Sequence, residues 1–276
     1  MTRTAIVTGA RGAIGSALSA ALRDGGWRVA GLDLEADAAA GVLACDVTDD
    51  GSVARAVPAA VEQLGGRLDA LVNNAGLGGP ASAGAAPDEH VRAMLDVNLL
   101  GAWRVTAAAI DELVDARGQV VLVGSRMAFI GLPLGAAYGV SKRGLVAYAD
   151  ALRAEYGTHV GVTCVHPAFI RTPIHDRTRA AGLKLEGFSR EEPLDRVVGR
   201  LVGACEGGPG GHGLRGWSAR RDVAVTRAGA LQLAAARHLP GVIDRVVART
   251  LKRRVAAGDL DDAPIAAGVR GRHGRP

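Results

Sequence analysis

The chain has 276 residues and a mass of 28.2 kDa, which suits one large domain or two small ones. Hydrophobic residues make up 48% and charged residues 22%, a composition that excludes a disordered protein. Aromatic residues reach only 3%, too few for a surface on which nucleic-acid bases stack. No run of about 20 apolar residues occurs, and the apolar start at Thr4–Val7 lacks a secretory pattern, so we expect neither a spanning helix nor a signal peptide.

The positive charge is concentrated at the C-terminal end. The formal net charge is +5, yet residues 210–276 carry 13 Lys and Arg against 5 Asp and Glu, so the remainder is slightly acidic. This distribution is typical of a solvated basic face and predicts no nucleic-acid partner. Cys45, Cys164 and Cys205 form no Cys-x-x-Cys pair or Cys/His cluster, which predicts reduced, buried thiols, no metal site and a cytoplasmic location.

Apolar runs of strand length alternate with helix-length segments from the start of the chain. The predicted strands are Thr4–Thr8, Arg28–Asp33, Val42–Cys45, Ala70–Asn73, Gln119–Gly124 and Val160–Val165. The predicted helices between them are Ile14–Asp24, Ser52–Leu64, Asp88–Val114 and Tyr138–Tyr156. Short apolar strands separated by helices indicate a parallel sheet covered on both faces. The fold class is therefore α/β, a Rossmann-like doubly wound sheet in three α/β/α layers with its ligand at the carboxyl ends of the strands.

The alternation weakens after about residue 205, where a Gly-rich breaker occurs. We assign residues 1–206 to a dinucleotide-binding and catalytic Rossmann domain, and residues 207–258 to a C-terminal extension packed on that domain. Within the extension, the sequence predicts a last short strand at Leu214–Trp217 and helices at Ala228–Arg237 and Val242–Val255. Residues 259–276 are rich in Gly, Arg and Pro, and we expect them to be disordered.

The helix expected at Val242–Val255 is amphipathic and basic. Its apolar residues fall on one side, and its Arg and Lys residues lie elsewhere around it. We expect this helix to dock on its own domain or on a neighbouring subunit. Peripheral contact with an anionic membrane is the second interpretation, and nucleic-acid binding is a distant third.

A glycine-rich turn follows the first strand and opens the first helix. Its candidate cofactor-binding residues are Gly9, Arg11, Gly12, Ala13, Ile14 and Gly15. Such a turn lets the backbone approach a pyrophosphate at the helix N-terminus, although the pattern also suits an ordinary tight turn. Asp33, at the end of the second strand, can accept both ribose hydroxyls of NAD and repel the extra phosphate of NADP. Because Arg11 is a weaker opposite signal, we expect NAD as the cofactor and keep NADP as the alternative.

Tyr138 and Lys142 stand four residues apart, so on a helix their side chains share one face. The chain has three Tyr and three Lys against 30 Arg, which makes a chance pair at this spacing uncommon. A cation beside a phenol lowers its pKa, so Tyr138 is a candidate general acid and base. Ser125, after the fifth strand, can hydrogen-bond a substrate oxygen, and Asn98 interrupts a long helix with a residue that prefers turns.

Together these features make the chain similar to the short-chain dehydrogenase/reductase family, from Thr8 to about Thr172. Other matching residues follow the third, fourth and sixth strands: Asp46, Val47, Asn74, Ala75, Gly76, Pro167, Ile170 and Thr172. The resemblance implies that these residues contact the cofactor. The chain departs from the family at Ala13 and Ala168, where Gly is usual, and at His166, where Asn is common. We expect His166 to be a local hydrogen-bonding residue.

The resemblance also implies roles for the catalytic set. Tyr138 would exchange a proton with the substrate oxygen, and Lys142 would bind the nicotinamide ribose and lower the pKa of Tyr138. Ser125 would orient the carbonyl or alcohol, and Asn98 would position a water that links Lys142 to solvent. A homodimer or homotetramer through the helices at 88–114 and 138–156 is implied as well.

Apolar residues after the catalytic positions predict a hydrophobic substrate pocket. Met127 and Phe169, with Ser125 and Tyr138, are the expected contacts to a small-molecule substrate, although ordinary packing explains either apolar residue equally well. We therefore expect an NAD(H)-dependent oxidoreductase that interconverts a secondary alcohol and a ketone on a lipid-like or polycyclic substrate. An NADPH-dependent ketone reductase is the alternative, and a non-catalytic nucleotide-sensing protein on the same fold is the third interpretation.

Overall fold

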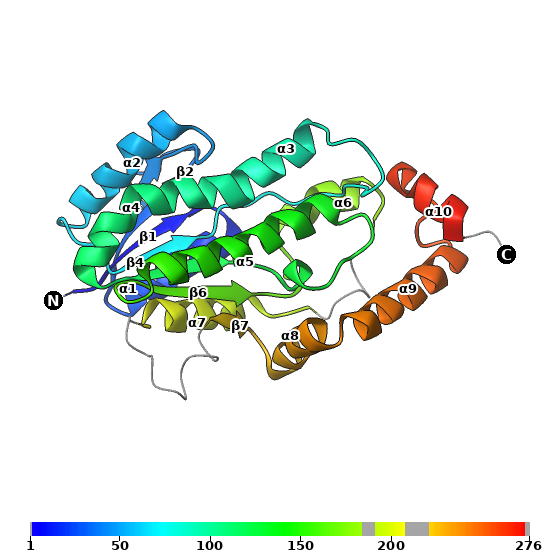
Figure 1. The fold of residues 1–276 in the computed structure, drawn as a ribbon. Coiled ribbons are helices and arrows are strands. Elements are labelled where there is room, and N and C mark those ends of the chain that lie inside the picture. Colours follow the sequence, from blue (N-terminus) through cyan, green and yellow to red (C-terminus); the bar gives the residue numbers. More distant parts are fainter. Residues whose placement is uncertain (1, 184–190, 208–220, 274–276) are drawn as a thin grey trace.

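The computed structural model describes residues 2–183, 191–207 and 221–273. A seven-stranded parallel sheet forms its centre, in the order β3-β2-β1-β4-β5-β6-β7. The strands are β1 (Thr4–Thr8), β2 (Arg28–Asp33), β3 (Val42–Ala44), β4 (Ala70–Asn73), β5 (Gln119–Val123), β6 (Gly161–His166) and β7 (Asp222–Ala224). The chain moves outward from β1 to β3, then returns to β4 and moves outward in the other direction (Figure 1). This order places a topological switch point between β1 and β4 and confirms the doubly wound α/β fold.

Helices cover both faces of the sheet and continue beyond it. They are α1 (Ala13–Asp24), α2 (Asp50–Gln63), α3 (Glu89–Leu95), α4 (Ala102–Ala116), α5 (Ala136–Tyr156), α6 (Asp176–Ala180), α7 (Leu194–Cys205), α8 (Arg227–His238), α9 (Pro240–Ala256) and α10 (Ala267–His273). A π-helical turn, η1 (Asp96–Gly101), and short 3-10 turns, η2 (Arg126–Ala128), η3 (Pro173–His175) and η4 (Pro264–Ala266), complete the set. Helices α2, α4 and α5 pack on one face of the sheet, and α1 and α7 pack on the other (Figure 1).

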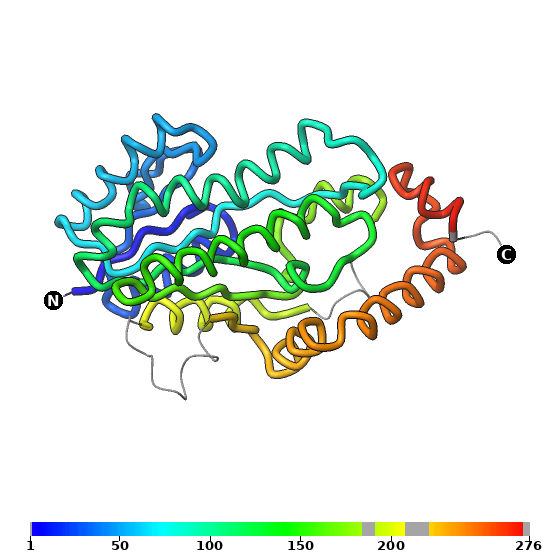
Figure 2. Tube along the Cα trace, viewed as in Figure 1, coloured from blue at the N-terminus to red at the C-terminus, as the bar shows by residue number. Residues whose placement is uncertain are grey.

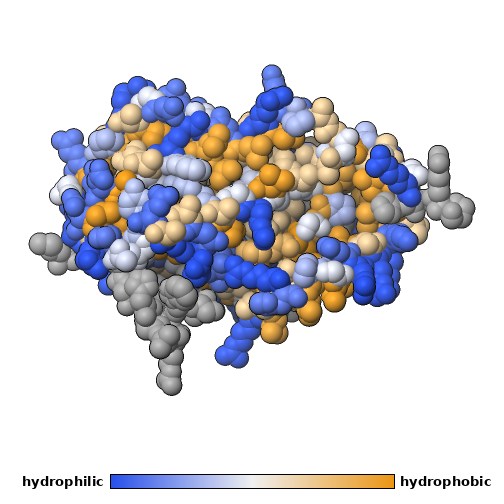
Figure 3. All heavy atoms as spheres, viewed as in Figure 1, coloured by the Kyte–Doolittle hydropathy of each residue, from blue (hydrophilic) through white to orange (hydrophobic). Residues whose placement is uncertain are grey.

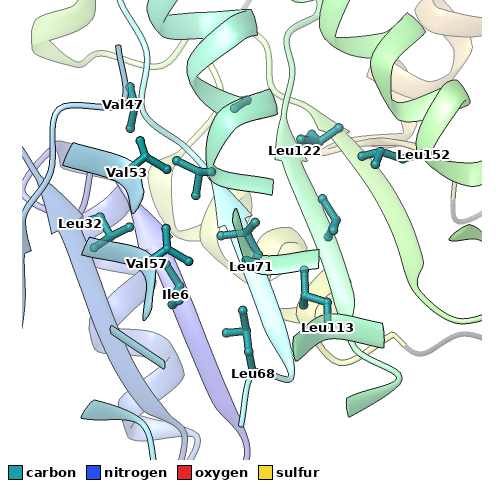
Figure 4. Close-up of a cluster of buried hydrophobic side chains, with 14 of the residues drawn as sticks. Ile6, Leu32, Val47, Val53, Val57, Leu68, Leu71, Leu113, Leu122 and Leu152 are labelled. Carbon is teal, nitrogen blue, oxygen red and sulfur yellow. The ribbon is translucent and has the colours of Figure 1, made fainter. Parts of the chain in front are cut away.

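Strand residues feed two apolar layers because successive side chains point to opposite faces of a sheet. In β1, Ile6 belongs to the layer under α2, α4 and α5, whereas Ala5 and Val7 belong to the layer under α1 and α7. Figure 4 shows the first layer, where Ile6 and Leu71 from strands meet Leu113 from α4. Both faces of the central strands are therefore buried, which explains why they read as continuous apolar runs.

The sheet takes its last strand from the segment that the sequence assigns to the extension. Strand β7 pairs in parallel with β6, and His166 lies opposite Ala224. A boundary at residue 206 therefore does not separate the Rossmann sheet from the C-terminal extension. This strand has only three residues and begins with Asp222, so its hydrophobic pattern is too short to predict. The strand predicted at Leu214–Trp217 lies outside the described residues.

The long helix predicted at Asp88–Val114 is present as the continuous run of α3, η1 and α4. Asp88 caps it, because its carboxylate accepts a hydrogen bond from the backbone N–H of Val91 at 2.8 Å. By length and composition alone this run resembles a membrane-spanning helix, but Leu113 is fully buried in the protein core. The π turn η1 changes the helical register locally and turns Asn98 toward the interior.

The end of the chain differs from the disorder expected over residues 259–276. Residues 259–273 instead form a turn, η4 and α10, which follow α9 at one end of the molecule (Figure 2). Leu260, Ala263 and Ala266 are buried in a small apolar cluster with Leu251 of α9 and with Leu134, which precedes α5. A few apolar residues suffice for this packing. The composition of residues 259–276, averaged over the whole segment, is polar and therefore did not predict it.

Helix α9 begins at Pro240, at the first helical position that proline favours. Its C-terminal half docks on the same chain, because Leu251 is only 6% exposed. Val242 and Val246 in the first half remain 49% and 52% exposed. Figure 3 shows apolar and hydrophilic residues side by side along α8 and α9.

Candidate active site

The glycine-rich turn leaves its backbone open to a phosphate group. Gly9 has φ +63°, and a Cβ on Gly15 would lie 2.1 Å from the carbonyl oxygen of Gly9. Only glycine suits either position without a backbone shift. Gly12, the N-cap of α1, makes no side-chain capping bond, and the first turn of α1 has no acidic residue. The N-terminus of α1 therefore presents backbone N–H groups and the positive end of the helix dipole, which fit a dinucleotide pyrophosphate.

Residues after β4 hold this turn in place. The Asn74 amide donates hydrogen bonds to the carbonyl oxygens of Thr8 and Gly9, at 2.9 and 3.1 Å. The Thr8 hydroxyl accepts hydrogen bonds from the backbone N–H groups of Asn74 and Ala75, at 2.9 and 3.0 Å. Asn74 and Ala75 thus fix the turn, while Gly76 lines the adjoining cleft.

Asp33 stands directly beside the turn, as predicted. Its carboxylate accepts hydrogen bonds from the backbone N–H groups of Arg11 and Leu34, each at 2.8 Å. The guanidinium of Arg11 instead pairs with Glu35, and the hydrogen bond to Glu35 raises the pKa of Arg11. The positive charge of Arg11 is therefore matched by acidic neighbours at the carboxyl end of β2.

Asp46 and Val47 follow β3 and belong to a local turn. The Asp46 carboxylate accepts hydrogen bonds from the backbone N–H and the hydroxyl of Thr48, at 2.9 and 2.7 Å. Val47 is buried, and a Cβ on Gly101 would lie 2.7 Å from its Cγ2. These contacts explain the local structure, and the implied cofactor contacts of Asp46 and Val47 stay predictions.

Tyr138 and Ser125 line the same cleft, and the Ser125 hydroxyl acts on the pKa of Tyr138. Ser125 follows β5, and its hydroxyl accepts a hydrogen bond from the backbone N–H of Met127 at 3.2 Å. Burial raises the pKa of Tyr138 to about 12, and the hydrogen bond with Ser125 lowers it only in part. The lowered pKa expected from the sequence is therefore wrong for this structure, because desolvation of the phenolate outweighs its neighbours. The phenol is protonated at neutral pH.

Lys142 lies one helical turn further along α5 and faces the same cleft. Its Nζ donates a hydrogen bond to the carbonyl oxygen of Val123 at 2.8 Å and lies 5.7 Å from the ring centroid of Tyr138. Burial lowers the pKa of Lys142 to about 8. The predicted placement of Tyr138 and Lys142 on one helix face is confirmed, and the charge of Lys142 changes just above neutral pH.

Asn98 is 1% exposed and braces the loop after β4 against α5. Its Oδ1 accepts a hydrogen bond from the backbone N–H of Leu77 at 2.7 Å. Its Nδ2 donates to the carbonyl oxygen of Leu77 and to the hydroxyl of Ser141, both at 3.0 Å. These bonds connect Asn98 to α5 at Ser141, the residue before Lys142. The water-positioning role implied for Asn98 stays a prediction.

One cleft at the carboxyl ends of the strands collects most of the predicted residues. Those that line it are Ile14, Asn74, Gly76, Ser125, Met127, Tyr138, Lys142, Pro167, Phe169, Ile170 and Thr172. The cleft encloses about 1070 Å³ of space, including its open mouth. The predicted residues outside its wall are Gly9, Arg11, Gly12, Ala13, Gly15, Asp33, Asp46, Val47, Ala75 and Asn98. Most of these belong to the β1–β3 half of the same sheet edge, beside the switch point.

A buried ionic network supports Ser125 from behind. The ring of His166 is fully buried, with Nδ1 at 3.2 Å from the carbonyl oxygen of Ser125 and Nε2 at 2.7 Å from the carboxylate of Asp222. Both neighbours are acceptors, so the two hydrogen bonds together need a proton on each ring nitrogen. Arg237 of α8 donates to the other carboxylate oxygen of Asp222 at 2.6 Å. His166 is thus confirmed as a hydrogen-bonding residue, and it connects α8 to Ser125 in the loop after β5.

Burial and the neighbouring charges act in opposite directions on the pKa of Asp222. Desolvation alone would raise the pKa of Asp222, but the hydrogen bonds and charges of His166 and Arg237 outweigh it and lower the pKa to about 2. Cys164, His166 and Asp222 place potential metal ligands within 4.8 Å of one another. Both nitrogens of His166 already face protein oxygens, and burial raises the pKa of the Cys164 thiol to about 12. The arrangement therefore suits a hydrogen-bonded ion pair better than a metal ion.

Several residues at the cleft carried no signal in the sequence. Gln232 of α8 lines the cleft and hydrogen-bonds the guanidinium of Arg126. Glu192 is 4% exposed, accepts a hydrogen bond from the backbone N–H of Ala168 at 2.8 Å, and lies 4.0 Å from Arg126. His175 of η3 also lines the cleft. These contacts join segments far apart in the chain, so no local pattern predicts them.

A Rossmann sheet with an open phosphate turn, beside a cleft that holds Ser125, Tyr138 and Lys142, defines a dinucleotide-dependent oxidoreductase. A family model described as short chain dehydrogenase matches residues 3–182. The chain belongs to this family, whose members act on CH–OH groups with NAD(P) as the hydride acceptor. The resemblance predicted from the sequence is thereby confirmed.

Individual relatives agree with this assignment. The chain is 37% identical over 187 residues to an uncharacterized oxidoreductase of Myxococcus xanthus, which covers 62% of this chain and 74% of the relative. It is 36% identical over 194 residues to the monensin polyketide synthase putative ketoacyl reductase of Streptomyces virginiae, covering 64% and 74%. A short chain dehydrogenase of Burkholderia cenocepacia in complex with NADP has a similar fold, with a TM-score of 0.73, 24% identity, and coverage of 89% and 97%.

Proposed function

We propose that the chain is an NAD(H)-dependent oxidoreductase that interconverts a secondary alcohol and a ketone on a hydrophobic substrate. The observation that carries this proposal is the meeting of Ser125, Tyr138 and Lys142 in one cleft whose other walls are largely apolar. When NAD(P) is bound in such a cleft it supplies or accepts the hydride. The protein's own task is to hold the substrate oxygen and to move one proton.

The proton step follows from the geometry of the three side chains. A substrate oxygen that takes hydrogen bonds from Ser125 and Tyr138 lies where the phenol can donate its proton to a ketone, or where the phenolate can take one from an alcohol. Because burial raises the pKa of Tyr138 to about 12, loss of its proton needs local compensation. Ser125 supplies part of it, and the Nζ of Lys142 lies 5.7 Å from the centre of the Tyr138 ring.

The environment of Asp33 supports NAD over NADP. The carboxylates of Asp33 and Glu35 lie at the end of β2, where the family binds the adenosine ribose, and the guanidinium of Arg11 is paired with Glu35. A 2′-phosphate at this place would face two carboxylates and would have to displace Glu35 from Arg11. Fluorescence titration with NADH and NADPH tests this choice, and tighter binding of NADPH would contradict it.

The surface of α4 and α5 supports a homodimer or homotetramer. Trp103 of α4 and Val140 of α5 are 52% and 59% exposed, and Leu100 in η1, directly before α4, is 44% exposed. Trp103 also stacks on Tyr148, with ring centroids 4.6 Å apart, so the two helices present one joined surface. Figure 3 shows apolar residues exposed on this side of the molecule. Sedimentation velocity tests the assembly, and a monomer at micromolar concentration would contradict it.

Replacement of Tyr138 by Phe tests the proposed reaction. Because the variant keeps the ring but loses the proton-transferring hydroxyl, we expect kcat to fall about 10²- to 10⁴-fold while NADH binding stays nearly unchanged. Tyr156→Phe at the end of the same helix α5 is the matched control and should keep wild-type activity. Near-normal turnover by Tyr138→Phe, read as the change in NADH absorbance, would show that the assigned mechanism is wrong.

A further inference from the structure

A second apolar chamber opens from the catalytic cleft beside Tyr138. It encloses about 720 Å³ including its mouth. Its wall consists mainly of glycine, proline and aliphatic residues: Gly78, Gly79, Pro80, Met127, Leu132, Pro133, Leu134, Gly135, Tyr138, Ile174, His175, Thr178, Leu183, Leu251 and Leu260. Met127, Leu132, Tyr138, Ile174 and His175 line both the chamber and the cleft. A molecule held at the Tyr138 hydroxyl can therefore extend one side chain into this chamber.

The far wall of the chamber is built by the C-terminal extension. Leu251 of α9 and Leu260 after it are 6% and 3% exposed, and they pack with Leu134 and Leu183 in one apolar cluster. Figure 1 shows α9 and α10 at the end of the molecule where α6 and the loop before α5 also lie. The extension thus limits how far the chamber reaches from Tyr138.

The loop before α5 is held in a demanding conformation at this wall. Leu134 has φ +61°, a left-handed backbone conformation that is uncommon for a residue with a branched side chain. Its carbonyl oxygen accepts a hydrogen bond from the backbone N–H of Ala81 at 2.7 Å, and its side chain is 7% exposed. The loop therefore accepts an unfavourable backbone conformation while its leucine side chain remains in the apolar wall.

The chemistry of the lining selects the ligand. Among the lining residues that the structure describes, Tyr138, His175 and Thr178 are those whose side chains carry polar atoms, and Tyr138 stands at the junction with the cleft. A sugar or other polyol placed here would lose its hydrogen bonds to water without replacing most of them. An alkyl chain or an alicyclic ring would gain from burial instead, by about fourfold in affinity for each methylene group.

We propose that this chamber binds an apolar chain on one side of the reactive carbon, and that Leu251 and Leu260 set the chain length that is accepted. The enzyme then acts on medium-chain secondary alcohols and ketones whose carbonyl lies near one end. This inference rests on the proposed oxidoreductase activity for its kinetic readout. It goes further in assigning the C-terminal extension as the part of the chain that determines specificity.

A series of 2-alkanones from butanone to dodecanone tests the proposal with NADH. We expect kcat/KM to rise about fourfold with each added methylene and then to level off or fall where the chain meets Leu251. Leu251→Phe should move that limit to shorter ketones. Leu251→Ala should move it to longer ketones. Val246→Phe, on the same helix but 52% exposed, is the matched control and should follow the wild type.

The outcomes separate the chamber from the proposed activity. If ketones are reduced but kcat/KM does not depend on chain length, or if Leu251→Phe and Val246→Phe behave alike, the chamber assignment is overturned and the activity stands. Calorimetric binding of 2-alkanols gives the second readout, which needs no turnover. If no ketone reacts, but affinity still rises with chain length and Leu251→Phe removes that rise, the activity proposal fails and the chamber stands.

Discussion

Replacement of Lys142 by Met should remove activity, and it should change the pH dependence of the unfolding free energy. Lys142 is 3% exposed, and burial lowers its pKa from 10.5 to about 8. Methionine has a similar length and no charge, so it removes the titrating group while keeping the shape of the site. Activity should be lost, because Lys142 holds the positive charge beside Tyr138.

The size of the effect follows from proton linkage. A lysine whose pKa falls from 10.5 to about 8 on folding costs about 3 kcal/mol of folding free energy at pH values below both. Between these values the unfolded chain still binds the proton that the folded chain has lost, so stability rises with pH there. From about pH 7 to about pH 9.5, the wild type should gain about 2 kcal/mol relative to Lys142→Met. Loss of the hydrogen bond from Lys142 to Val123 changes the difference in unfolding free energy between the two proteins by a similar amount at every pH, so it affects the pH dependence less.

Urea unfolding followed by circular dichroism, at several pH values in this range, measures the difference in unfolding free energy. Lys252→Met is the matched control, since it makes the same replacement at an exposed lysine on α9. A difference between wild type and Lys142→Met that stays within about 0.5 kcal/mol across the range would refute the reasoning. It would mean that water reaches Lys142 or that its charge is compensated.

Two further replacements test the turn and the ionic network. Gly15→Ala should destabilise the protein by about 1–3 kcal/mol and abolish stabilisation by NADH in thermal unfolding, because its Cβ would lie 2.1 Å from the Gly9 carbonyl oxygen. Gly12→Ala should destabilise the protein less than Gly15→Ala, since its Cβ would lie 3.3 Å rather than 2.1 Å from that oxygen. Asp222→Asn should remove the about 2 kcal/mol that this carboxylate contributes above about pH 4, a contribution lost toward pH 2 as its pKa of about 2 is approached. Identical acid unfolding of Asp222→Asn and wild type would contradict the assigned ion pair.

The sequence predicted the sheet and the placement of Tyr138 and Lys142 because both depend on local patterns. Strands buried on both faces must be continuous apolar runs, and six of the seven appear as such. Tyr138 and Lys142 share a helix, so their spacing alone places them on one face. The turn at Gly9–Gly15 is readable because only glycine fits where a Cβ would strike the backbone.

The pKa of Tyr138 could not be predicted in this way. The sequence shows a cation near a phenol, which favours the phenolate, but it does not show how completely both groups are removed from water. In the structure, desolvation raises the pKa of Tyr138 to about 12 and lowers that of Lys142 to about 8. The same burial therefore acts against the charged form of each partner. A bound substrate oxygen and cofactor would have to provide the polarity that the folded chain lacks.

The C-terminal extension was the least predictable part, and its contacts show why. Arg237 reaches Asp222 and through it His166 and Ser125, whereas Leu251 closes the apolar chamber beside Tyr138. Each of these contacts spans a long stretch of chain and depends on one side chain, so no periodicity reveals it. The C-terminal extension contacts the network behind Ser125 and also bounds the chamber, so it links the proposed substrate length to the geometry of the site. Because of this link, substitutions in α8 at Arg237 should alter kcat, and substitutions in α9 at Leu251 should alter the preferred chain length, although neither helix carries a catalytic residue.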